Sequence, residues 1–94
     1  MRLSKSTQKT IHETIVKFDS KAKVLLFGSR TDDSAKGGDI DLLVISEILT
    51  MRDLRKIKIH LQDQLGMQRF DMILASPDLA DPFAKMAFDQ GISL

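Results

Sequence analysis

The chain has 94 residues, a length that is enough for one small domain over residues 1–94, and its formal net charge is +1. It has no cysteine, which excludes disulfides, thiolate metal sites and a cysteine nucleophile. The near-neutral charge and the five aromatic residues, all Phe, argue against direct binding of nucleic acid. The sequence has no apolar run of membrane-spanning length and no signal peptide, so we expect no membrane association and a cytoplasmic location.

Two stretches, residues 6–18 and 50–65, repeat apolar residues with the period of a helix. Each carries one apolar stripe, formed by Ile11, Ile15 and Phe18 in the first and by Leu54, Ile57, Leu61 and Leu65 in the second. Thr50 and Asp53 resemble a capping box at the start of the second helix, and Gly66 is suited to its end. Two helices, each with one buried face, are therefore predicted.

Three short apolar runs, residues 23–28, 39–46 and 69–75, predict buried strands. The polar residues 29–38 between the first two predict a loop. A last helix is expected from Asp81-Pro82 to about Gln90, because Asp is a good cap and Pro suits a first turn. The order predicts an α/β (α+β) domain in which helices cover a three-stranded sheet.

Two carboxylates of the second strand, Asp39 and Asp41, are two residues apart. Alternation along a strand directs both to one face, while Ile40 between them faces a core. Asp71 interrupts the apolar third strand and would join the pair if the two strands are neighbours. Such carboxylates suit Mg²⁺, and three of them can hold two metal ions about 4 Å apart for phosphoryl or nucleotidyl transfer.

A phosphate site is predicted where the first strand ends, at Phe27-Gly28-Ser29-Arg30. Gly28 lets a phosphate approach the backbone closely. A helical turn starting at Ser29 would offer free N–H groups and a hydroxyl donor. Arg30 adds a fork-shaped cation that suits phosphate.

Each signal also has a simpler interpretation. An isolated Asp-x-Asp usually means a solvated face or turn, and Asp71 alone could be a charge that protects an edge strand from aggregation. A plain αβ domain with a fortuitous motif is the corresponding alternative, and it requires Asp71 to lie far from Asp39. The three signals together, in this order and on these elements, favour a catalytic site.

The motifs resemble those of the DNA polymerase β-like nucleotidyltransferases, in which Gly-Ser precedes an Asp-x-Asp and a later acidic strand residue. The matching residues are Gly28-Ser29, Asp39-Ile40-Asp41 and Asp71. With Arg30, the sequence Gly-Ser-Arg also resembles the form typical of the minimal, MNT-type branch. The resemblance implies a mixed three-stranded sheet packed with helices. It implies that Gly28 and Ser29 hold the triphosphate of ATP or another nucleoside triphosphate. It also implies that Asp39 and Asp41 bind Mg²⁺ and that Asp71 completes the metal site and helps to activate the attacking hydroxyl.

The resemblance further implies a partner. MNT-type proteins are often paired with a HEPN protein similar to an RNase toxin, and the MNT protein looks like an antitoxin that transfers AMP to it. The alternative is a non-catalytic antitoxin that neutralises its partner by contact alone, motivated by the small size and by the acidic residues Asp32 and Asp33 in the loop. An exposed apolar patch around Phe83 and Ala87 would mark a subunit interface, in a homo- or hetero-oligomer.

Several other residues are expected to stay outside the chemistry. His12 and His60 are interpreted as bystanders without a visible acidic or metal partner. The basic cluster of the second helix is either a solvated face or a surface that meets an acidic partner; it comprises Arg52, Arg55, Lys56 and Lys58.

Overall fold

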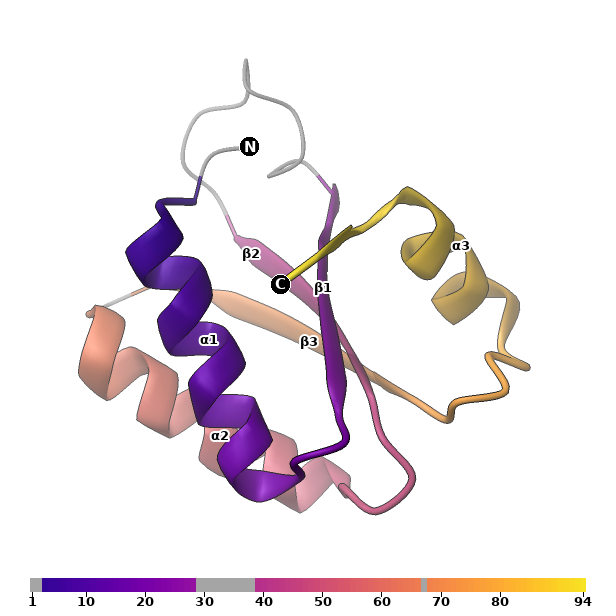
Figure 1. Ribbon diagram of the computed structural model, residues 1–94, viewed down its shortest axis with the longest axis horizontal. Helices are drawn as coiled ribbons and strands as arrows, with labels where there is room; N and C mark the ends of the chain where they lie inside the picture. The colour runs from indigo at the N-terminus through magenta and orange to yellow at the C-terminus, as the bar shows by residue number, and fades with distance from the viewer. Residues whose placement is uncertain (1–2, 29–38, 67) are drawn as a thin grey trace.

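The computed structural model describes residues 3–28, 39–66 and 68–94. Its elements run in the order α1 (Lys5–Phe18), β1 (Lys23–Phe27), β2 (Ile40–Ile45), α2 (Met51–Leu65), β3 (Phe70–Ala75), α3 (Pro82–Gln90) and β4 (Ile92–Ser93). All the predicted helices and strands are confirmed, with boundaries that differ by one or two residues. The α+β class with a mixed sheet is confirmed as well (Figure 1).

The sheet has four strands in the order β3-β2-β1-β4, so the expected number of three is wrong. β1 is antiparallel to β2 and β4, and β2 is parallel to β3. The additional strand pairs with β1 at Leu25 and Leu26, and the Leu94 N–H donates to the Val24 carbonyl over 2.9 Å. Two residues are too few to show any periodicity, so sequence patterns could not reveal β4.

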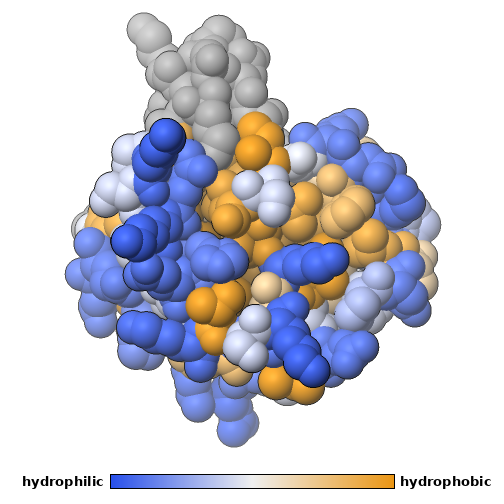
Figure 2. Space-filling model, in the orientation of Figure 1, coloured by the Kyte–Doolittle hydropathy of each residue, from blue (hydrophilic) through white to orange (hydrophobic). Residues whose placement is uncertain are grey.

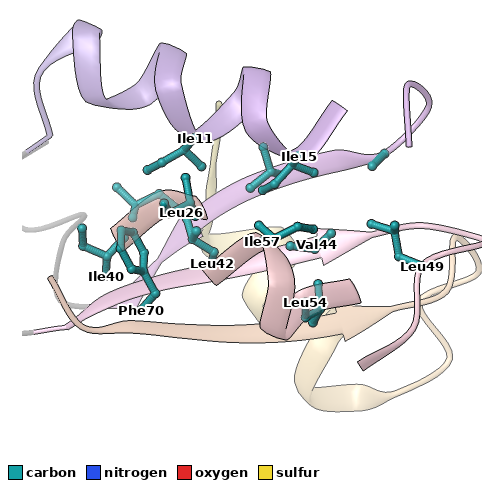
Figure 3. Packing of buried hydrophobic residues seen from close by; sticks show 13 residues of the cluster. Ile11, Ile15, Leu26, Ile40, Leu42, Val44, Leu49, Leu54, Ile57 and Phe70 are labelled. Carbon is teal, nitrogen blue, oxygen red and sulfur yellow. The ribbon is translucent and has the colours of Figure 1, made fainter. Parts of the chain in front are cut away.

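Helices cover both faces of the sheet, but unequally (Figure 1). α1 and α2 lie side by side on one face, where their stripes pack on alternate strand residues (Figure 3). The fully buried members of this core include Ile11, Ile15, Leu26, Ile40, Leu42, Val44, Ile57 and Leu61. Burial of such side chains stabilises a fold by about 1.5–3 kcal/mol each, so this core supplies most of the driving force.

α3 covers the opposite face with two small residues, Ala84 and Ala87, which pack near Leu25 and Leu43. Its larger side chains remain exposed, with Phe83 at 49% and Met86 at 43% of their surface. Figure 2 accordingly shows hydrophobic surface on the side of α3, whereas hydrophilic residues cover the side of α1. Among the described residues, every helix is too short or too polar to cross a membrane.

Helix ends follow the sequence signals. Thr50 and Asp53 form the expected capping box, in which the Asp53 N–H donates to the Thr50 hydroxyl over 3.2 Å. Asp81 caps α3 ahead of Pro82, and Gly66 ends α2 with a φ of 85°. These devices were predictable because each acts within one helical turn.

A side-chain link joins two connections at the end of the sheet remote from Gly28. The Ser46 hydroxyl donates to Asp19 over 2.6 Å and accepts from the Ile48 and Leu49 N–H groups over 3.1 and 3.0 Å. The hydrogen bond from Ser46, followed by one from the Lys21 N–H, holds the pKa of Asp19 below its ordinary value. Ser46 therefore ties the α1–β1 turn to the β2–α2 connection.

We expect Ser46→Ala to lower the free energy of unfolding, since the buried Leu49 N–H loses its acceptor. Such a loss typically costs roughly 1–3 kcal/mol, and urea denaturation would measure it. Ser76→Ala is the matched control, because Ser76 donates only to the nearby exposed Asp78. Equal effects of the two substitutions would contradict the structural role of Ser46.

Candidate active site

One row of residues crosses three strands of the sheet. Phe27 in β1 is the register partner of Asp41 in β2, and Asp41 is the register partner of Asp71 in β3. Register partners share a face, and their neighbours Ile40 and Leu42 are buried on the opposite side. The expectation that Asp71 joins the carboxylates of β2 is confirmed for Asp41, on the face that α3 partly covers.

Gly28 lies directly against Asp41. It has a φ of 78°, which strongly favours glycine, and a Cβ atom built there would lie 3.2 Å from Asp41 Cγ and closer still to a carboxylate oxygen. The absence of a side chain at Gly28 therefore makes room for the Asp41 carboxylate. This contact joins the predicted phosphate site to the predicted acidic site at one end of the sheet.

The electrostatic environment of Asp41 disfavours a negative charge. Burial raises its pKa above the ordinary value, and the nearby charges of Asp71 and then Asp39 raise it further. A folded-state pKa above the unfolded-state value means that ionisation of Asp41 costs stability as the pH rises through that window. A cation between the carboxylates would reverse this cost.

We expect Asp71→Asn to lower the pKa of Asp41 towards its ordinary value, because one of the two repelling charges is removed. The shift would be partial, since burial is the larger cause and is unchanged. NMR titration of the Asp41 carboxyl carbon measures it. Asp89→Asn, on the exposed face of α3, is the control, and the same shift in both variants would contradict the proximity of Asp71.

Asp39 immediately precedes β2 and behaves differently from its neighbours. Its carboxylate forms an ion pair with Arg69, with 3.4 Å between Oδ1 and Nε, and about a third of its side chain is exposed. Arg69 has the equivalent position before β3, and the Ile40 N–H donates to its carbonyl over 2.8 Å. Sequence reasoning did not identify Arg69, because its proximity to Asp39 follows from the parallel register of β2 and β3.

In the described ranges, no group of three or more His, Cys, Asp and Glu side chains is arranged so that it could hold a metal ion. Asp41 and Asp71 are register partners, whereas Asp39 is turned towards Arg69. Metal binding at Asp39, Asp41 and Asp71 therefore stays a prediction. The predicted phosphate ligands Ser29 and Arg30, and the loop of residues 29–38, lie outside the described residues.

The sequence also did not predict the aromatic packing next to Asp41 and Asp71. Phe27 meets Phe83 edge to face, with 6.1 Å between ring centroids and 80° between planes. Phe83 belongs to the first turn of α3, so this pair fixes one end of α3 beside the row. His60 meets Phe18 of α1 edge to face, with 5.7 Å between ring centroids.

Comparison with known protein families identifies the family of this chain. The family model described as the nucleotidyltransferase domain matches residues 9–86, which include Gly28, Asp39, Asp41 and Asp71. The chain belongs to the nucleotidyltransferase domain family. Comparison with curated protein sequences finds no match. Membership of this family indicates the general class of activity, which is nucleotidyl transfer.

Proposed function

We propose that this nucleotidyltransferase domain uses Mg²⁺ to transfer AMP from ATP to a hydroxyl group of an acceptor protein. The observation that carries the proposal is the register of Asp41 with Asp71, on the face where Gly28 adjoins Asp41. Carboxylates paired in this way recur where metal ions position a nucleoside triphosphate for in-line attack. ATP is the preferred donor because AMP transfer is what the MNT-type resemblance implies.

The donor set fits Mg²⁺. Carboxylate oxygens are the ligands that Mg²⁺ prefers. Burial and then the charges of Asp71 and Asp39 raise the pKa of Asp41, and a divalent cation would offset both of these costs of its negative charge. Asp41 and Asp71 would hold the ion, and Asp39 would join them on leaving Arg69. When bound, Mg²⁺ neutralises triphosphate charge and the charge that develops during transfer. The same carboxylates would hold a second ion, which would supply further stabilisation of negative charge.

The residues then have separate roles. Gly28 presents its backbone to the triphosphate, and Ser29 and Arg30 would add a hydroxyl and a guanidinium donor to it. Asp71 accepts the proton of the attacking hydroxyl. The hydroxyl oxygen forms a bond to the α-phosphorus, the bond from the α-phosphorus to the oxygen bridging to the β-phosphorus breaks, and pyrophosphate leaves.

The acceptor that we propose is a HEPN-type toxin, with this domain as its antitoxin. The similarity of Phe27-Gly28-Ser29-Arg30 to the MNT-type branch supports this choice. The ion pair between Asp39 and Arg69 favours a second candidate, neutralisation of the partner by contact without catalysis. A substitution that blocks chemistry but preserves the surface separates the two candidates.

The experiment uses ATP labelled on either the α- or the γ-phosphate, with Mg²⁺ and the protein encoded next to this chain. We expect label from the α-phosphate to reach the acceptor with release of pyrophosphate, and no transfer from the γ-phosphate. Asp39→Asn and a chelator should each abolish transfer. Asp41→Ala should fail to neutralise the partner; full neutralisation by that variant would establish the contact-only alternative.

A further inference from the structure

A small pocket adjoins the acidic row at the outer side of β3. It has a volume of about 250 Å³ and lies between α2 and β3. α2 contributes Met51, Arg55 and Lys58, and β3 contributes Asp71 and Met72. The pocket therefore places two cationic side chains beside the residue that is proposed to take the proton of the acceptor.

Arg55 and Lys58 lack an ion-pair partner in the described part of the chain. Arg55 and Lys58 are exposed neighbours three residues apart on α2, where like charges destabilise a helix slightly. Within residues 3–28, 39–66 and 68–94, neither takes part in an ion pair. Two neighbouring cations that form no ion pair with the described residues are suited to an anionic ligand.

The pocket also lies along the open edge of the sheet. β3 is the outermost strand on this side, so one row of its backbone groups has no strand partner in the described part of the chain. The Arg69 carbonyl accepts from the Ile40 N–H over 2.8 Å, and the Ala75 carbonyl accepts from the Ser46 N–H, directly after β2, over 3.0 Å. Because backbone directions alternate, the N–H and C=O of Met72 point to the outer edge, into the region of the pocket.

Successive side chains along β3 point to opposite faces of the sheet. Phe70 and Met72 face the side of α2, whereas Asp71 faces the side of α3. An extended segment running beside β3 would alternate in the same way. One residue of that segment would meet Arg55 and Lys58, and the next would lie beside Asp71.

We propose that the acceptor protein adds an extended segment to the open edge of β3, in which an acidic residue directly neighbours the hydroxyl residue that receives the nucleotide. The carboxylate binds Arg55 and Lys58, the backbone pairs with Met72, and the hydroxyl lies beside Asp71. This inference rests on the proposed function, because it is the transfer reaction that requires an acceptor next to Asp71. It defines the acceptor by its chemistry, as an acidic strand-forming segment.

The test uses a fluorescent peptide of alternating glutamate and serine, with a lysine–serine peptide for comparison. We expect the glutamate peptide to bind and to shift the Met72 backbone amide resonance. The double variant Arg55→Glu with Lys58→Glu should weaken its binding at least about tenfold and favour the lysine peptide. Arg52→Glu with Lys56→Glu is the matched control, since it makes the same charge change on the same helix outside the pocket.

Three results would overturn the inference: equal effects of the two double variants, an unshifted Met72 amide with bound peptide, or weaker binding of a fluorescent ATP analogue by the Arg55/Lys58 variant. The last result would assign the pocket to the nucleotide. The proposed function fails separately. Peptide binding as expected, with no label transferred to any acceptor, would refute the transfer reaction and support the docking site. Undiminished transfer to the partner by the Arg55/Lys58 variant would support the reaction and refute the docking site.

Discussion

Asp41→Asn is expected to reduce nucleotidyl transfer on the order of 10³-fold, comparable to the loss of a principal electrostatic contact in an active site. Asp41 lies between Gly28 and Asp71, so it is the carboxylate that links the proposed phosphate site to Asp71. A neutral amide of nearly the same shape would fill this space without supplying charge for Mg²⁺. Initial rates of α-phosphate label transfer at saturating ATP measure the effect.

The same substitution should leave the fold intact. Burial and two neighbouring carboxylates disfavour the charge of Asp41, so removing that charge should preserve or increase the free energy of unfolding above the ordinary aspartate pKa. Circular dichroism and urea denaturation check this. Asp89→Asn is the control, because Asp89 is an exposed partner of Lys85. Transfer within tenfold of the unsubstituted protein would refute the role of Asp41.

Gly28→Ala is expected to reduce both stability and transfer, through two separable causes. A φ of 78° costs a residue with a side chain about 1–2 kcal/mol. The new methyl group would also displace the Asp41 carboxylate, because it would occupy the space that this carboxylate fills. We therefore expect lower stability together with a loss of transfer on the order of 10²-fold, as for a displaced catalytic group.

Gly66→Ala separates the two causes. Gly66 has a similar φ of 85°, but a Cβ atom there meets nothing within 4 Å. It should lose a similar amount of stability in urea denaturation and keep its transfer rate. If both alanine variants lose transfer equally, the effect of Gly28→Ala comes from backbone strain alone and the contact with Asp41 has no catalytic importance.

Features that depend on a single turn of chain were predictable from sequence. The capping box of Thr50 and Asp53 and the Asp81-Pro82 start of α3 involve residues within one turn, and the apolar stripes of α1 and α2 follow from the helical period alone. The shared face of Asp41 and Asp71 was also predictable, but only on the assumption that β2 and β3 are neighbours.

Features set by register between distant segments were not predictable in this way. The ion pair of Asp39 with Arg69 and the contact of Phe27 with Phe83 each join residues at least 30 positions apart, and nothing in their local sequence identifies the partner. β4 was missed for a different reason: Ile92–Ser93 is too short for periodicity, and its strand conformation comes from pairing with β1.

The unequal cover of the two sheet faces has a consequence for local opening. α1 and α2 are anchored by large aliphatic side chains, whereas α3 is attached through Ala84, Ala87 and the ring of Phe83. Detaching α3 thus exposes far less apolar surface than detaching either of the other helices, and segments of this kind open at lower free energy. The face that bears Asp41 and Asp71 is consequently the one that is uncovered first, while the opposite face stays folded.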